Sequence, residues 1–151
     1  MPLSALPGLG AWCAENDFAL EDEGPDAAIM TCREDGNVWS LIRTDAGGFL
    51  QVACFVDTVE ASHAVSLTLA RLHDRQLGCR FSIDEDDALL LRADLYPHDQ
   101  TGAAVGAVVN QMQWVVDLTY DLLTAVRDTN KAADEADIDA AFGLAPDTRL
   151  N

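Results

Sequence analysis

Basic residues are scarce in this chain. Its 151 residues include one lysine and eight arginines against 26 acidic residues, which gives a formal net charge of -17. Proteins bind nucleic acids by neutralising phosphates with Lys and Arg, and they reach anionic membrane surfaces through the same residues. Direct binding of nucleic acid or of such a membrane is therefore disfavoured. The charge instead favours solubility or a basic protein partner, since long-range fields steer association.

Long hydrophobic runs are also missing. Apolar residues make up 49% of the chain, but no stretch approaches the roughly 18 uninterrupted apolar residues of a transmembrane helix. The amino-terminal residues lack the basic and apolar regions of a secretory signal. The four cysteines form no C-x-x-C pair and are expected to be buried thiols. These absences predict a cytoplasmic protein without a membrane segment or disulfides.

Catalytic and metal-binding motifs are absent as well. The sequence has no phosphate-binding glycine loop, no G-x-S-x-G elbow and no Cys/His nucleophile arrangement. His63 and His73 are too far apart along one predicted helix to share a metal. The acidic run at 84–87 lacks the glycine and glutamate of an EF-hand. Asp117 and Asp121 share a helical face but have no histidine or cysteine in register. We therefore expect no enzyme activity, catalytic residue, metal or cofactor.

The hydrophobic pattern that is present predicts one α+β domain. Helical periodicity covers residues 4–16, 58–77 and 102–128, and strand alternation covers 27–33, 38–44, 49–56, 79–84 and 88–95. Short turns join the first three strands into an antiparallel meander and the last two into a hairpin. The acidic run at 21–24 is predicted to be a solvated connection. The helix at 58–77 is predicted to begin at an Asp57 N-cap, with Glu60 completing a capping box.

The helix at 102–128 has a broader apolar surface than one sheet face needs. Excess apolar surface indicates a second packing partner, which is either the rest of the chain or another subunit. We place the single domain at residues 1–130. Residues 131–151 form an acidic segment that either adds a short helix or remains a mobile tail. The candidates for a dimer interface are Val105, Val108, Val109, Met112, Val115, Val116, Leu122 and Leu123.

The order helix, three strands, helix, two strands, long helix resembles the YbjN family of putative bacterial sensory transduction regulators. The stretches that carry the resemblance are Asp35-Gly36-Asn37-Val38-Trp39-Ser40-Leu41, residues 77–95, and the long helix after Gly102. The match is loose at residues 72–76, where many members carry asparagines. The fold of that family is similar to that of type III secretion chaperones.

This resemblance implies a homodimer without an active site, which presents its sheet to a partner polypeptide in a chaperone-like or adaptor role. Two other readings stay open. One is an acidic regulator that binds a basic, possibly DNA-binding, protein by charge mimicry, and the other is a small-ligand sensor or an enzyme with an unrecognised site. The candidates for the partner-binding patch are Trp39, Leu41, Phe49, Ala53 and Phe55, unless they form ordinary core beneath a helix.

Overall fold

The computed structural model describes residues 1–45 and 47–143. In chain order the elements are η1 (Leu3–Ala5), α1 (Leu9–Glu15), β1 (Phe18–Asp22), β2 (Ala27–Cys32), β3 (Val38–Arg43), β4 (Leu50–Thr58), α2 (His63–His73), β5 (Arg80–Ile83), β6 (Ala88–Leu95), η2 (Pro97–Asp99), α3 (Gly102–Thr129) and α4 (Glu135–Ala141). The predicted α+β class, with a meander, a hairpin and a long helix, is confirmed.

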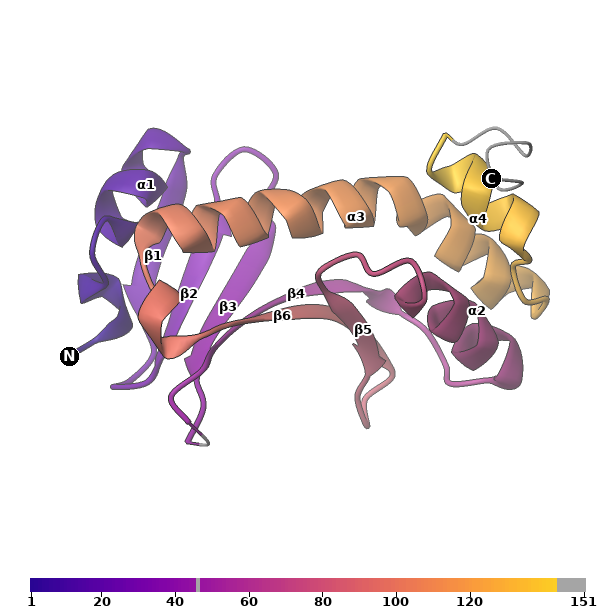
Figure 1. Ribbon diagram of the computed structural model, residues 1–151, viewed down its shortest axis with the longest axis horizontal. Helices are drawn as coiled ribbons and strands as arrows, with labels where there is room; N and C mark the ends of the chain where they lie inside the picture. Colours follow the sequence, from indigo (N-terminus) through magenta and orange to yellow (C-terminus); the bar gives the residue numbers. More distant parts are fainter. Residues whose placement is uncertain (46, 144–151) are drawn as a thin grey trace.

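The six strands form one antiparallel sheet in the order β1-β2-β3-β4-β6-β5 (Figure 1). Strands β1 to β4 form a meander, and the β5–β6 hairpin joins it through pairing of β6 with β4. Val52 in β4 pairs with Leu41 on one side and with Ala93 on the other. Because side chains alternate along a strand, such rows give the sheet one strongly apolar face.

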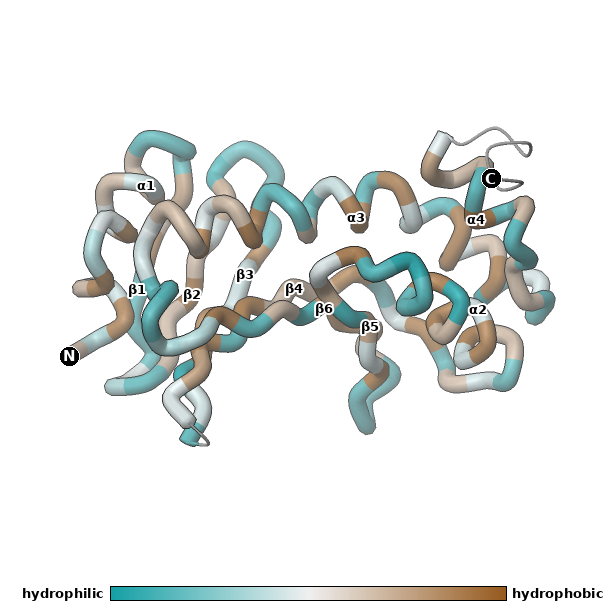
Figure 2. The backbone as a smooth tube through the Cα atoms, viewed as in Figure 1, coloured by the Kyte–Doolittle hydropathy of each residue, from teal (hydrophilic) through white to brown (hydrophobic). Residues whose placement is uncertain are grey.

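Helix α3 lies lengthwise over this apolar face (Figure 1). The helix begins where the Thr101 hydroxyl accepts a hydrogen bond from the Ala104 N–H at 3.2 Å, and it ends at Asn130 in a left-handed conformation. In Figure 2 hydrophobic positions recur along α3 between hydrophilic ones, as expected of an amphipathic helix. Buried residues of α3 share one core with sheet residues, among them Val105, Val109, Met112, Val115, Leu41, Val52 and Leu91.

Helix α1 packs against the start of α3 through two glycines. A Cβ atom on Gly106 would lie 2.2 Å from Nε1 of Trp12, and one on Gly102 would lie 2.3 Å from the carbonyl carbon of Gly8. Both distances are shorter than any non-bonded carbon contact allows. Trp12 in turn stacks on Phe18 of β1, with 5.2 Å between the ring centroids. Because Gly102 and Gly106 have no side chain, α1 can approach α3 closely, and α1 and β1 together close one end of the core.

The amino-terminal edge of the sheet corrects the prediction for residues 21–24. Glu21 and Asp22 belong to strand β1, where Glu21 pairs with Ile29 and Asp22 with Ala28. Their side chains are exposed, so their polarity is compatible with an edge strand. The residue that anchors the strand is Phe18, because its half-buried ring packs on Trp12. The fold thus has one more strand than the sequence pattern predicts.

The predicted boundaries of the second helix are wrong at both ends. Asp57 and Thr58 do not precede a helix but extend β4, where they pair with Leu89 and Ala88 beyond a β-bulge. Pairing with β6 provides hydrogen-bond partners for the backbone groups of these residues, so the strand continues through them and the helix starts later. Its actual N-cap is Ser62, whose hydroxyl accepts a hydrogen bond from the Val65 N–H at 3.2 Å.

The described part of the segment after residue 130 folds back onto α2. The short helix α4 buries Ile138 completely. Arg75, which lies just after α2, forms ion pairs with Glu135 at 2.6 Å and with Asp139 at 2.7 Å. The Ala133 N–H donates to the hydroxyl of Thr68 in α2 at 3.0 Å. The division of the chain at residue 130 stays a prediction. Residues 144–151 lie outside the described residues.

Candidate protein-binding surface

The sheet has a second face, which points away from α3. Among the described residues, the α-helices lie along one side and at the ends of the sheet, so that the other side carries no helix (Figure 1). We call this surface the open face and define it by the residues of its hollow that alternate with core residues along the strands: Val38, Ser40 and Ile42 of β3, Gln51, Ala53 and Phe55 of β4, and Leu90 and Arg92 of β6.

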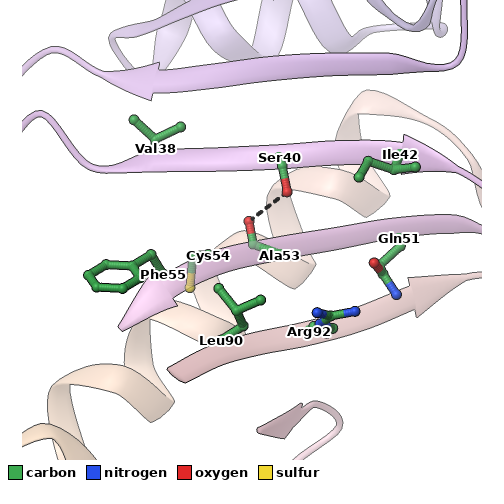
Figure 3. Close-up of a pocket in the computed structure, with 9 residues that line it drawn as sticks. All are labelled: Val38, Ser40, Ile42, Gln51, Ala53, Cys54, Phe55, Leu90 and Arg92. Carbon is green, nitrogen blue, oxygen red and sulfur yellow. Dashed lines mark hydrogen bonds between the residues drawn. The ribbon is translucent and has the colours of Figure 1, made fainter. Parts of the chain in front are cut away.

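The centre of the open face is hollowed, and Figure 3 shows the side chains around it. The hollow has a volume of about 320 Å³. It exists because the middle row of the face is small: Ser40 and Ala53 pair across β3 and β4, and the Ser40 hydroxyl lies 3.5 Å from the carbonyl oxygen of Ala53. Larger side chains stand in the rows on either side, with Phe55 paired to Leu90 in one and Ile42 to Gln51 in the other.

Several large apolar side chains on this face are exposed to solvent. Phe55 is 59% exposed, Val38 48% and Ile42 43%. Scattered apolar residues are common on protein surfaces, but these gather around one hollow on central strands. Contiguous apolar patches of this kind mark interaction sites on soluble domains. The open face can therefore accept apolar side chains from another molecule.

One cation lies at the edge of this apolar hollow. Arg92 of β6 pairs with Ala53 on one side and with Arg80 of β5 on the other. Among the described residues, its Nε atom is buried and has no hydrogen-bond partner. The hydroxyl of Ser82 on β5 is also buried without a partner in that part of the chain. Arg80 differs from Arg92, because it forms an ion pair with Asp94 at 2.9 Å.

The structure divides the residues predicted for the partner-binding patch. Trp39 and Leu41 are 2% and 0% exposed and lie in the core on the α3 side of the sheet. Phe49 is half-buried and packs against Tyr96, with 5.2 Å between the ring centroids. Ala53 and Phe55 lie together on the open face. The sequence pattern brings two of the five candidates to this surface.

The residues that the prediction missed had a signal in the alternation of the strands. Val38 and Ile42 alternate with Trp39 and Leu41, so they must point to the opposite face. Leu90 and Arg92 alternate in the same way with Leu89 and Leu91, which are fully buried. The alternation does not show which of the two faces of the sheet α3 covers. That choice decides whether Trp39 or Val38 is accessible.

The residues predicted for a dimer interface mostly face the protomer's own sheet. Five of the eight, Val105, Val109, Met112, Val115 and Leu123, are at most 3% exposed. Val108, Val116 and Leu122 are half-buried and pack against the same core. The rest of the chain thus supplies a packing partner for this helix. The dimer interface stays a prediction, and among the eight residues the half-buried three keep surface that a second copy could contact.

Two of the polar residues considered for chemistry, His73 and Asp117, form hydrogen bonds within the chain. The Nε2 atom of His73 accepts a hydrogen bond from the Phe81 N–H at 2.9 Å, and burial lowers the pKa of this histidine. Burial raises the pKa of the Cys54 thiol to about 12 and that of Cys79 to about 11, so both are protonated and poor nucleophiles at neutral pH. Asp117 accepts a hydrogen bond from Gln113 at 2.8 Å. Within residues 1–45 and 47–143, no group of three or more potential ligands could hold a metal ion.

Comparison with solved structures identifies the fold. A chain of the ExsC–ExsE complex superimposes with a TM-score of 0.53 and 17% identity, covering 64% of this chain and 75% of that chain. A chain of the heterodimeric ExoU–SpcU complex, from the type III secretion system of Pseudomonas aeruginosa, gives a TM-score of 0.53 and 14% identity, covering 79% of this chain and 97% of that chain. The predicted type III secretion chaperone-like fold is confirmed.

These likenesses concern the fold, since the identities are low. No family model matches the sequence, so the resemblance to the YbjN family has no support. No curated protein matches it either. None of the helices in the described part of the chain is long and apolar enough to cross a membrane.

Proposed function

We propose that this protein is a non-catalytic, chaperone-like or adaptor module that binds a partner polypeptide on its open face and acts as a homodimer. The observation that carries the proposal is the exposed apolar hollow between Val38, Phe55 and Ile42, on a sheet face that α3 does not cover. Both structural neighbours come from protein complexes, which supports a protein ligand. An extended segment suits such a surface, because its alternate side chains can enter pockets on the sheet.

The experiment is affinity capture with a matched pair of variants. Tagged wild-type protein, Phe55→Ser and Tyr120→Ser are used to isolate partners from the native organism, and bound proteins are identified by mass spectrometry. Phe55 is on the open face, whereas Tyr120 is an exposed aromatic residue on α3. We expect one or a few proteins to bind wild type and Tyr120→Ser, and to be lost from Phe55→Ser. A captured set that Phe55→Ser leaves unchanged would contradict the proposal.

A second candidate function follows from the net charge of -17. In this alternative the protein is an acidic regulator that binds a basic protein by charge mimicry. It is favoured because five of the seven arginines in the described chain are engaged in salt bridges, which leaves the surface dominated by carboxylates: Arg33, Arg43, Arg75, Arg80 and Arg127. Partner affinity that falls steeply with added salt would favour this candidate, and salt-independent affinity would favour apolar binding on the open face.

A further inference from the structure

Arg92 differs from the other arginines of the described chain in having no acceptor. Five of those arginines form salt bridges with carboxylates, and Arg71 donates to the carbonyl oxygen of Ala133 at 2.6 Å. Arg92 forms no ion pair in the described residues, although the chain carries 26 acidic residues. An unpaired guanidinium in a strongly acidic protein is therefore a local exception to the charge of the whole molecule.

No acceptor among the described residues is bonded to the Nε atom of Arg92. The nearest acidic side chain along its own strand is Asp94, whose carboxylate already binds Arg80 at 2.9 Å. Across the strands its paired residues are Ala53 and Arg80, and neither has a side-chain acceptor. The Nε atom is thus buried without a hydrogen bond to the described protein atoms. A buried donor without a partner is unfavourable. Arg92 as a whole is half-buried and lines the hollow, so its terminal guanidinium nitrogens can bind a ligand carboxylate through charge-assisted bonds.

The position of Arg92 relative to the hollow defines what a ligand must offer. Neighbouring strands lie about 4.8 Å apart, and alternate residues of an extended chain lie about 7 Å apart. Ala53 lies at the floor of the hollow and is paired directly with Arg92. The backbone positions of the two residues are therefore one strand spacing apart. In Figure 3 Arg92 stands beside Leu90 and Gln51 at the side of the hollow. One short segment can reach both places with neighbouring side chains.

We propose that the open face binds a polypeptide segment that places a large apolar side chain in the hollow over Ala53 and a carboxylate, one or two residues away, against Arg92. This inference rests on the proposed function and adds the chemistry of the ligand. The net charge of -17 repels densely acidic segments. The segment therefore carries a single acidic residue beside its apolar anchor, with neutral or basic residues around them.

The test is a selection from a randomised dodecapeptide library displayed on yeast, carried out with folded wild-type protein. Arg92→Met removes the charge and keeps an apolar stem, whereas Ala53→Leu fills the hollow. Arg33→Met is the matched control, because Arg33 is bound to Asp17 and does not line the hollow. We expect wild type and Arg33→Met to enrich peptides in which Asp or Glu lies one or two residues from a large apolar residue, several-fold over the unselected library.

The two variants separate the parts of the proposal. Arg92→Met should keep the apolar preference and lose the acidic one, and Ala53→Leu should lose both. Apolar enrichment without an acidic preference, or an acidic preference that survives Arg92→Met, overturns the inference and leaves the proposed function standing. Absence of any enrichment overturns both. If the wild-type protein is a dimer and the Phe55→Ser variant is a monomer, a second copy of the chain occupies the open face, and the inference is also overturned.

Discussion

At the scale of single residues, Gly106 sets how closely α1 approaches α3. In an exposed helix, Gly→Ala stabilises by roughly 0.5–1 kcal/mol. Here we expect Gly106→Ala to lower the free energy of unfolding by about 1–3 kcal/mol, because overpacking forces the Trp12 ring to move. Urea unfolding measures the change. Gly10→Ala in α1 is the control, since its Cβ would meet nothing within 4 Å, and it should be neutral or stabilising. Equal effects of the two substitutions would refute this role for Gly106.

At the scale of elements, α4 is held against the segment that follows α2 by ion pairs of Arg75 with Glu135 and Asp139. Asp139 is 1% exposed and lies 2.7 Å from the guanidinium. Removing one partner of a buried ion pair destabilises by about 3–5 kcal/mol. We expect Arg75→Met to cost somewhat less, about 2 kcal/mol, because α4 can detach and hydrate Asp139. Limited proteolysis should then cut within residues 131–143, where wild type resists.

A double substitution distinguishes the ion pair from simple packing at this site. Arg75→Met with Asp139→Leu removes both charges and should recover part of the lost stability and of the protease resistance, since well-packed apolar pairs replace buried ion pairs with little loss. The argument fails if Arg75→Met alone leaves both the unfolding midpoint and the cleavage pattern of wild type unchanged.

Several elements could be predicted from the sequence because their signals are local. The long helix α3 has Thr101 as its N-cap and a continuous amphipathic pattern, and its predicted start at Gly102 matches the structure. Strand β1 could not be predicted, because pairing with β2 and the packing of Phe18 on Trp12 stabilise it, and neither contact is visible in its short acidic sequence. The predicted start of α2 was wrong for a similar reason. Asp57 is a good N-cap in isolation, but strand β4 continues through it.

At the scale of the whole molecule, the candidate site depends on which side of the sheet α3 covers. Alternation separates Trp39 and Leu41 from Val38 and Ile42, but both sets are apolar and either could form the core. The decision comes from the connection after β6, which returns the chain along one face. The hollow and the unpaired Arg92 depend on the register between three strands, and a single sequence does not contain that register.

The homodimer is the last prediction, and the net charge determines its salt dependence. Two copies that each carry -17 repel one another, so association needs an apolar contact that outweighs the repulsion. Raising salt from about 0.01 M to about 0.15 M shortens the screening length from about 30 Å to about 8 Å. We therefore expect sedimentation equilibrium to show a dimer in the micromolar range whose dissociation constant falls as salt is added. Phe55→Ser should leave the dimer intact, because the open face is proposed to bind the partner. A monomer throughout the micromolar range at both salt concentrations would rule the dimer out.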